Sequence, residues 1–419
     1  MMAICGLDFG TTNSTFSYLG VDGQVQLVPL EQGKETLPTA VFFNFEEGEA
    51  FYGREALEQY VEGEFGRLMR ALKSVLGTSL MADKTQVQGK LVAFEDIIAR
   101  FLKEMKTRAE QHTQQVFDSV VLGRPVHFID DDKTADQQAE DTLRQAAIKA
   151  GFEHIEFQYE PIAAALDYEQ STQQEELALI VDLGGGTSDF SVVRVSPAGQ
   201  QKVDRREDIL ATGGVHIGGV DFDRRLSLHT VMPELGYRMP FKDNAGQEFP
   251  VYYHQNLATW HKIHFLYDKE TEISLRSMLN QVSHKALLER LLTVVENREG
   301  HRVAIAVENA KITLTEQDNH VDSFDFIEKG LTIDFEKSTL NSAIEDDVER
   351  VCQAALATLK RAGVEKAAID KVFMTGGSTS IPYIRQSILA LFPEAEVVDG
   401  HTFGSVGTGL CLHAKRVFA

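Results

Sequence analysis

The sequence contains one short pattern twice, near its start and near its middle. Residues 3–19 read AICGLDFGTTNSTFSYL and residues 176–195 read ELALIVDLGGGTSDFSVVRV. Each copy is an apolar strand that ends in an aspartate, a loop of glycine and threonine, and a second apolar strand. Such an internal repeat indicates two lobes of similar construction. A chain of 419 residues is also longer than one compact core usually fills.

The other segments alternate between helical and strand patterns. Between residues 94 and 111 apolar side chains recur every three or four positions, which predicts an amphipathic helix. Further helices are expected at residues 138–152, at 339–363 and after 409, and strands at 119–128 and 371–377. Residues 232–253 are expected to be irregular because of their prolines and glycines. The alternation predicts an α/β fold.

The first loop offers groups that suit a phosphate and a metal ion. Asp8 ends the strand, and the loop after it contains Gly10, Thr11, Thr12 and Asn13. A glycine at the tip lets backbone N–H groups approach a phosphate closely, and the two hydroxyls add donors. An aspartate at the end of a strand can hold Mg²⁺ through its water shell. By itself this pattern is also typical of an ordinary hairpin turn.

The second loop carries the same groups in greater number. Asp182 ends the strand. The residues after it supply a glycine run, a hydroxyl and a second carboxylate: Gly184, Gly185, Gly186, Thr187 and Asp189. Three consecutive glycines weaken a strand, so a functional reason for them is expected. Two such loops at corresponding places in a repeat are hard to attribute to chance.

Two further glycine turns precede predicted helices. The turn with Gly376, Gly377 and Ser378 follows an apolar strand, where α/β proteins bind ligands. This turn carries no acid or base, so contact with a base or a ribose is its expected role, although an ordinary strand–helix turn explains it equally well. The turn with Gly218 and Gly219 is expected to direct N–H groups toward a terminal phosphate.

The composition excludes several classes of function. The net charge is −22 and no lysine- or arginine-rich run interrupts it, so nucleic acid and anionic membranes are not expected partners. The three cysteines are scattered, which indicates a reducing compartment and excludes a cysteine-based zinc site. We find no signal peptide and no apolar stretch of membrane-spanning length, and we expect a cytoplasmic protein. The GxxxxGK[ST] run of P-loop proteins is absent.

Together the motifs resemble the ATPase domain of DnaK-type chaperones of the heat-shock-70 family, in the actin-like ATPase superfamily. GLDFGTTNS is similar to the first phosphate loop of that family, VDLGGGTSD to the second and FMTGGSTSIP to the adenosine loop. YEPIAAALDY and FGSVGTGLC are similar to its two connecting segments. The resemblance covers essentially the whole chain and is greatest to the short members of the family.

The resemblance implies two ribonuclease-H-like lobes around a central nucleotide cleft. Lobe I is expected at residues 1–170 and 396–419, with an inserted subdomain at about 35–116. Lobe II is expected at residues 171–395, with an inserted subdomain at about 215–330. No peptide-binding domain is expected, so the resemblance implies a nucleotide-dependent switch that acts on an unidentified protein client or co-chaperone.

The resemblance also assigns catalytic roles. It implies that Asp8 and Asp182 organise Mg²⁺ and its waters, and that Lys73 reaches the γ-phosphate and the attacking water. Glu160 and Thr187 are implied to position that water. Without the resemblance, Lys73 would be interpreted as a solvated helix lysine.

The implied cofactors are ATP or ADP, Mg²⁺ and K⁺. Asp189 matches a K⁺-coordinating aspartate of the family. Glu308, Lys311 and Thr315, in VENAKITLT, match three residues that hold the adenosine. Hydrolysis is expected to be slow and to depend on positioning and electrostatics.

Four positions depart from the family pattern. Ile312 and Ser380 stand where the family has arginines, and His401 stands for an aspartate near the adenosine. These changes remove cation–π and charged contacts from the base, so nucleotide affinity is expected to be lower. Glu140 stands where the family has a basic residue used for signalling between domains.

Three other functions compete with an ATPase switch. A nucleotide-sensing scaffold would bind ATP with scarcely any hydrolysis, and only Lys73, Glu160 and Thr187 argue against it. A small-molecule kinase of the same superfamily would need a substrate base, and we find no aspartate for it outside the phosphate loops. No feature of the sequence favours an actin-like filament.

Overall fold

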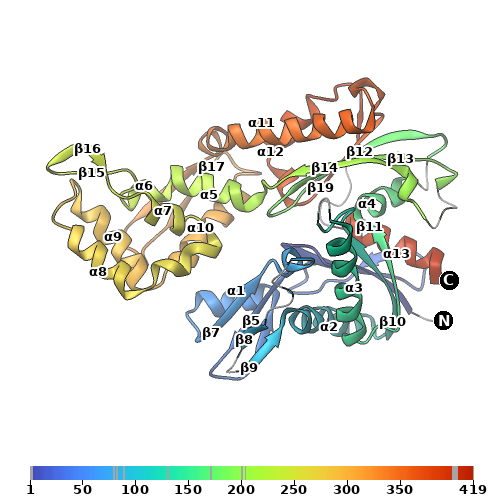
Figure 1. The fold of residues 1–419 in the computed structure, drawn as a ribbon, viewed down its shortest axis with the longest axis horizontal. Coiled ribbons are helices and arrows are strands. Elements are labelled where there is room, and N and C mark those ends of the chain that lie inside the picture. Colours follow the sequence, from blue (N-terminus) through green and yellow to red (C-terminus); the bar gives the residue numbers. More distant parts are fainter. Residues whose placement is uncertain are drawn as a thin grey trace.

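The structure is a computed structural model that describes residues 3–78, 81, 84–87, 90–129, 132–169, 172–199, 202, 204–398 and 404–418. Its centre is a pair of mixed sheets (Figure 1). The first sheet has the order β11-β10-β1-β2-β3, with β4 paired to β2. Its strands are β1 Ala3–Asp8, β2 Asn13–Leu19, β3 Val25–Leu27, β4 Thr36–Pro38, β10 Phe117–Arg124 and β11 His154–Tyr159.

The second sheet repeats this arrangement in the order β20-β19-β12-β13-β14. Its strands are β12 Glu176–Leu183, β13 Ser188–Val195, β14 Ile209–Val215, β19 Lys371–Thr375 and β20 Glu396–Val398. In both sheets the strand that ends in the aspartate loop pairs antiparallel with the next strand and parallel with a later one. The predicted α/β fold and the internal repeat are therefore confirmed. β20 begins at residue 396, the predicted start of the returning part of lobe I, and pairs with β19 in the second sheet.

The apolar strands are buried on both faces. In β12, Leu179 and Val181 contribute to the core on one face, and Ala178 and Ile180 contribute to the core on the other. Side chains of a strand alternate between faces, so an almost continuous apolar run suits a sheet that is covered on both sides.

Two helices pack between the sheets. α4 (Glu160–Glu169) and α13 (Ser405–Phe418) share one core with side chains of both sheets. A Cβ on Gly409 would lie 1.8 Å from Ala163 O, so only glycine allows the helices to cross at this distance. α13 begins at Ser405 and not after residue 409 as expected, because Gly407 and Gly409 lie inside the helix and Gly409 makes this crossing possible.

Five further helices accompany the two sheets, and the longest of them packs against β13 and β14. They are α2 Phe94–Thr113, α3 Lys133–Lys149, α5 Gly219–His229, α11 Lys337–Ala362 and α12 Pro382–Leu389. α11 ends at Gly363, whose φ of 67° gives the left-handed cap expected of a terminal glycine. The predicted helices at 94–111 and 339–363 are thus confirmed. The helix predicted at 138–152 is present with other bounds, because α3 begins five residues earlier, after the side-chain cap of Asp132, and ends at Lys149. The predicted strand at 119–128 is too long, since β10 ends at Arg124 before Pro125, which has no N–H to donate.

Two inserted segments extend from the sheets. The first contains β5 Ala40–Asn44, β6 Ala50–Tyr52, α1 Gly53–Val61, β7 Gly66–Arg70 and the 3₁₀ helix η1 Leu72–Val75, followed by β8 Lys84–Val87 and β9 Lys90–Ala93. The second contains α6 Val231–Glu234, β15 Pro240–Phe241, β16 Asn244–Glu248, α7 Tyr252–Leu257, the 3₁₀ helix η5 Trp260–Leu266, α8 Lys269–Met278, α9 Lys285–Glu296, α10 Gly300–Thr313, β17 Asn319–Ser323 and β18 Thr332–Glu336. The region 232–253, expected to be irregular, includes the short hairpin β15–β16.

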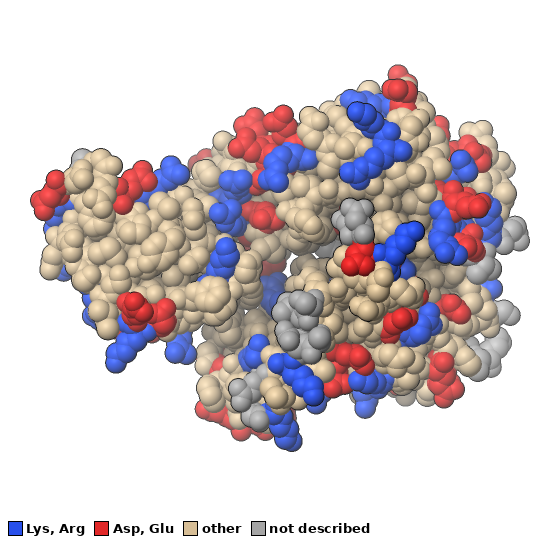
Figure 2. All heavy atoms as spheres, in the orientation of Figure 1, with Lys and Arg blue, Asp and Glu red and all other residues tan. Residues whose placement is uncertain are grey.

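Charges are distributed unevenly over the surface. On the face in Figure 2, basic and acidic side chains alternate over the sheets, and the outer part of the second inserted segment has few charges at its centre. Within the described part of the chain, none of the helices combines the length and the apolar character that crossing a membrane requires.

Candidate functional site

A lysine and a glutamate from distant segments meet at the ends of the sheet strands. Lys73 Nζ lies 2.6 Å from Glu160 Oε1, and the two side chains are only 11% and 15% exposed. Lys73 comes from η1 and Glu160 is the first residue of α4. The interpretation of Lys73 as a solvated helix lysine is therefore wrong.

Asp8 and Asp182 lie beside this ion pair. A Cβ on Gly123 of β10 would lie 3.5 Å from Asp8 Oδ1 and 3.3 Å from Glu160 Cγ. Burial and then the negative charge of Glu160 raise the pKa of Asp8 to about 7. Burial and the negative charges of neighbouring carboxylates, Asp189 first, raise the pKa of Asp182 to about 8.

The charge of Lys73 is stabilised by these carboxylates. Burial alone would lower the pKa of its ammonium group, but the negative charges of Glu160, Asp8 and Asp182 raise that pKa above its usual value. One lysine therefore stands among several carboxylates, and this excess of negative charge suits an additional cation.

The two glycine turns that precede helices both contact the second glycine loop. Gly219 N donates to Gly184 O (3.0 Å) and Val220 N donates to Gly185 O (2.8 Å). Ser378 Oγ also donates to Gly184 O, over 3.1 Å. The turns at Gly218–Gly219 and Gly376–Ser378 are thus fixed directly against the phosphate loop predicted at residues 182–189.

The first glycine loop approaches the second from the other sheet. A Cβ on Gly185 would lie 1.9 Å from Thr12 Oγ1, and a Cβ on Gly218 would lie 2.6 Å from Gly185 C. No side chain fits at either position without displacing its neighbour. Nothing lies within 4 Å of a Cβ placed on Gly186, so the middle of the loop is open. This narrow cradle of backbone groups suits a phosphate.

Thr39, which directly follows β4, holds the first glycine loop in place. Its N–H donates to Thr12 O (2.8 Å) and its hydroxyl donates to Gly10 O (2.8 Å). Thr11 lies in the bend between these residues, and Asn13 begins β2. Thr39 was not predicted from the sequence, because no local pattern indicates that it contacts the loop.

Thr187 and Asp189 form a pair at the end of the second loop. Thr187 Oγ1 donates to Asp189 Oδ2 over 2.7 Å. Asp189 pairs with Asp182 across the β12–β13 hairpin, and its side chain is exposed. Among the described residues, no three histidine, cysteine, aspartate or glutamate side chains converge on one point as direct metal ligands. The role of Asp189 in K⁺ binding and of the other aspartates in Mg²⁺ binding remains a proposal.

The residues predicted to hold adenosine lie on or after α10. Lys311 is buried, forms an ion pair with Asp223 Oδ1 (2.8 Å) and donates to Gly219 O (3.1 Å). Thr315 donates to the backbone of Ile312 (2.7 Å). Burial and the nearby charge of Glu308 raise the pKa of Asp223 to about 6, and Lys311 opposes this rise.

Asp223 was missed by the sequence analysis. It is the last residue of the glycine-rich segment GGVHIGGVDFD, but the spacing gives no sign that it pairs with Lys311 of a helix far along the chain. Lys311 thereby connects α10 to α5 and to Gly219.

Two of the four departures from the family pattern fall on exposed positions. Ile312 is 56% exposed on α10, and Ser380 is exposed at the end of the turn that begins with Gly376 and Gly377. His401 lies outside the residues that the structure describes. Glu140 forms ion pairs with Arg124 and Arg144, so its charge is compensated locally.

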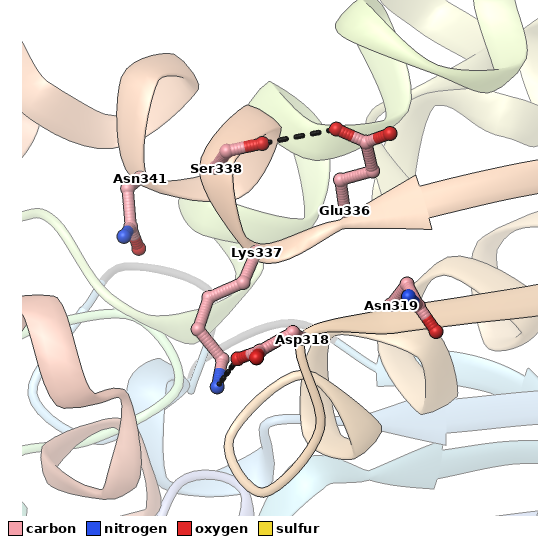
Figure 3. Close-up of a pocket in the computed structure, with 6 residues that line it drawn as sticks. All are labelled: Asp318, Asn319, Glu336, Lys337, Ser338 and Asn341. Carbon is pink, nitrogen blue, oxygen red and sulfur yellow. Dashed lines mark hydrogen bonds and ion pairs between the residues drawn. The ribbon is translucent and has the colours of Figure 1, made fainter.

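A separate hollow of about 450 Å³ lies at the base of the β17–β18 hairpin. Figure 3 shows the polar side chains that line it: Asp318, Asn319, Glu336, Lys337, Ser338 and Asn341. Lys337 reaches down to Asp318 (2.8 Å) and closes one side. None of the predicted site residues lines this hollow.

The chain was compared with known proteins. A family profile described as Hsp70 protein matches residues 4–234 and 289–400. The chaperone protein DnaK of Thermosipho africanus (strain TCF52B) is 28% identical over 396 residues, which cover 93% of this chain and 55% of that protein. The chaperone protein DnaK of Thermotoga maritima is 28% identical over 398 residues, with the same coverage of 93% and 55%. The chain spans about half the length of these relatives.

Proposed function

The chain belongs to the Hsp70 family, and on this premise we propose that it binds ATP with Mg²⁺ where the glycine loops of its two sheets meet. We further propose slow hydrolysis, which changes the angle between the lobes and is read by a protein client or co-chaperone in the cytoplasm. The observation that carries the proposal is the Lys73–Glu160 ion pair at 2.6 Å, beside Asp8 and Asp182.

The residues present fit a phosphate and a divalent cation. Gly185 and Gly218 leave room only for backbone, and N–H groups are the donors that phosphates accept. Asp8 and Asp182 would hold Mg²⁺ through its water shell. When bound, Mg²⁺ supplies positive charge that neutralises the phosphate oxygens.

The catalytic contribution of the chain is positioning and charge. Lys73 would exchange its bond with Glu160 for a phosphate oxygen, which leaves the Glu160 carboxylate to orient the attacking water. Thr187 would orient the same water with its hydroxyl. Asp189 would bind K⁺ through its exposed carboxylate. The backbone amides are already in position, so they would stabilise the charge that develops in the transition state without having to reorganise.

Lys311 would support the adenosine from α10, together with Glu308 and Thr315. Its ammonium group is already held by Asp223 and by Gly219 O, so the position of this group would change little when the ribose binds. The exposed Ile312 adds no charge there.

One alternative is a nucleotide-sensing scaffold that does not hydrolyse ATP. The observation that favours it is the same 2.6 Å contact, because hydrolysis requires Lys73 to leave Glu160. Binding of ATP without release of phosphate would identify this function.

Nucleotide binding is tested by a pair of glycine substitutions. Gly185→Ala places a methyl group against Thr12 and should weaken ATP binding at least tenfold in titration calorimetry with Mg²⁺. Gly246→Ala in the exposed hairpin β15–β16 is the matched control, because its methyl group meets only Asn244 Oδ1, at an ordinary contact distance of 3.5 Å. Equal affinity in both variants, with unchanged circular dichroism, would contradict a phosphate site at this loop.

A further inference from the structure

Four side chains join the two inserted segments. Tyr60 of α1 and Arg70 of β7 come from the first segment, and Trp260 of η5 and His301 of α10 come from the second. Arg70 Cζ lies 4.3 Å from the centre of the Trp260 ring, and Tyr60 Oη lies 2.9 Å from His301 Nδ1. The His301 ring stands edge-on to both Tyr60 and Trp260, with ring centres 4.7 Å apart in each pair. We call these four residues the clasp.

The polar groups of the clasp are matched to one another. His301 is buried and its Nε2 lies 3.2 Å from Trp260 O, which can only accept. Nε2 therefore carries the proton, and Nδ1 accepts from the hydroxyl of Tyr60. Burial lowers the pKa of His301 to about 4, so the ring is neutral and this arrangement holds at neutral pH. Aromatic pairs and a cation over a tryptophan are each stabilising.

Arg70 connects the clasp to the predicted catalytic lysine. It is the last residue of β7, and Lys73 follows in η1. Between them Ala71 has φ 54° and ψ 40°, a left-handed conformation that a residue other than glycine adopts only under constraint. Leu72 is buried, so the turn cannot shift without moving the core. The orientation of Arg70 and that of Lys73 are thus linked through a short, rigid turn.

We propose that Arg70 is a positioning residue: its stacking on Trp260 holds the two inserted segments together over the nucleotide site, and the turn at Ala71 transmits this closure to Lys73. The inference rests on the proposed function and names the side chains that regulate it. Breaking the clasp frees the second inserted segment to move away, which opens the path by which nucleotide leaves. It also loosens the turn that holds Lys73 at the nucleotide site, where its ammonium group would reach a phosphate oxygen.

Trp260 is the only tryptophan in the chain, so its emission reports the clasp directly. Arg70→Gln removes the cation from the ring, and Arg70→Lys restores a charge at the end of a flexible stem. Lys262→Gln is the matched control, because it removes an exposed lysine of η5 that is two residues from Trp260 and is not stacked on it. Acrylamide quenching of nucleotide-free protein should rise about twofold in Arg70→Gln, should rise less in Arg70→Lys and should not change in the control.

The same variants are then loaded with a fluorescent ADP and with γ-labelled ATP. Arg70→Gln should release ADP about two- to thirtyfold faster, the range that a lost cation–π contact corresponds to. At saturating ATP its single-turnover phosphate release should be at least fivefold slower, with partial recovery in Arg70→Lys. A purely structural role would change release of ADP and leave the saturated rate of phosphate release unchanged, which would overturn the coupling to Lys73.

Two outcomes separate this inference from the function on which it rests. Wild-type protein that binds no ADP would overturn the proposed function itself. Wild-type protein that binds ADP, with identical quenching and release in Arg70→Gln and Lys262→Gln, would overturn the clasp alone.

Discussion

Asp8 and Asp182 share a small volume with Glu160, and the charges that they carry when ionised repel one another. Burial first, and then the negative charges of neighbouring carboxylates, raise their pKa values to about 7 and about 8, so ionising both aspartates costs free energy. Sites that keep like charges together in this way are typical of function and not of stability.

The pH dependence of ligand binding follows from these pKa values. Asp8 and Asp182 must be ionised to hold the waters of Mg²⁺, so affinity for Mg-ATP should rise about tenfold between pH 6 and pH 8.5, with release of protons on binding. Calorimetry in buffers of different ionisation enthalpy measures both quantities. ATP loses its own last proton in the same range, so the comparison is with Asp182→Asn, whose curve should be flatter. Identical curves for the two proteins would contradict the assignment.

Asp182→Asn should stabilise the protein at alkaline pH. The pKa of Asp182 is raised from its ordinary value to about 8, so its contribution to stability is fully present at acidic pH and is lost as pH rises toward 8. The amide carries no charge and avoids this loss. Without ligand, the variant should therefore melt about 2 °C or more above wild type at pH 8.5 and show little difference at pH 4. A variant that melts below wild type at pH 8.5 would show that the Asp182 charge is stabilising.

Residues of the site differ in how far the sequence predicts them. Asp8 and Asp182 could be predicted because an acidic residue at the end of an apolar strand, followed by a glycine loop, is a recognisable local pattern. Thr39 and Asp223 contact the same loops but lie in segments with no pattern of their own. Their positions depend on which strands and helices approach in three dimensions, and the sequence alone does not fix these approaches.

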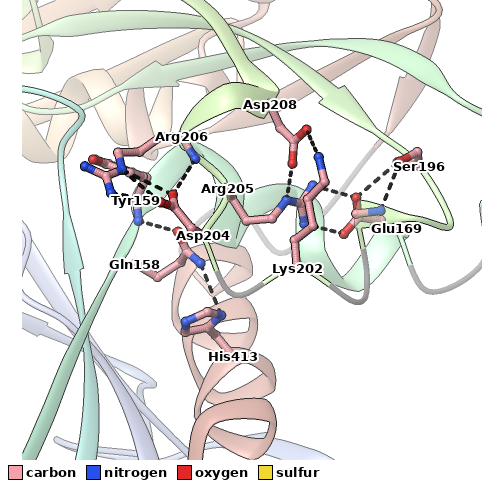
Figure 4. Close-up of polar contacts among 11 residues, drawn as sticks. Gln158, Tyr159, Glu169, Ser196, Lys202, Asp204, Arg205, Arg206, Asp208 and His413 are labelled. Atoms are coloured by element: carbon pink, nitrogen blue, oxygen red, sulfur yellow. Dashed lines mark hydrogen bonds and ion pairs between the residues drawn. The ribbon is translucent and has the colours of Figure 1, made fainter.

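At the scale of secondary-structure elements, an ion network joins α4 to the segment between β13 and β14. Arg205 is 1% exposed and bonds both oxygens of Glu169 on α4 (2.7 Å each). It also bonds Asp208, which accepts in addition from Lys202. Figure 4 shows this network next to the contact between Gln158 of β11 and His413 of α13. The network therefore ties the second sheet to the helix that leads out of the first.

Removing the arginine from this network should be costly. Arg205→Ala leaves Glu169 and Asp208 buried without their shared cation, and we expect a loss of about 3–5 kcal/mol in the free energy of unfolding. Arg206→Ala is the control one residue away, because Arg206 is 70% exposed and pairs only at the surface. Denaturant unfolding should show little change for the control. Equal stability of the two variants would mean that the network does not hold α4.

The elements themselves were largely predictable. Regular apolar spacing identified α2, and Gly363 marked the end of the helix that is α11. The start of α13 was placed too late, because glycines usually interrupt helices and here permit the crossing with α4. At that position tertiary packing outweighs the low intrinsic helix propensity of glycine.

At the scale of the whole molecule, the repeat explains why one site can form between two similar halves. Each sheet presents an aspartate and a glycine loop at the same end of the corresponding strand. Bringing the two sheets together around α4 and α13 therefore brings the two loops together as well. A repeated loop in the sequence predicts this convergence, whereas the contacts between the inserted segments have no counterpart in the repeat.

The contacts of the second inserted segment could not be predicted from the sequence. Residues 235–288 are not matched by the Hsp70 family profile, and Trp260 of the clasp lies among them. Its contact with Arg70 joins residues that are far apart in the chain and show no common pattern. Such pairs are established only by the folded arrangement of both segments.

We propose that the chain hydrolyses ATP with Lys73 as a catalytic residue. Single-turnover release of phosphate from γ-labelled ATP, with Mg²⁺ and K⁺ present, can be measured in wild type, Lys73→Ala and the surface control Lys149→Ala. We predict slow release in wild type and in the control, and at least a hundredfold slower release in Lys73→Ala while ATP remains bound. Binding of ATP with no release in any of the three proteins, or equal release in all three, would contradict the claim.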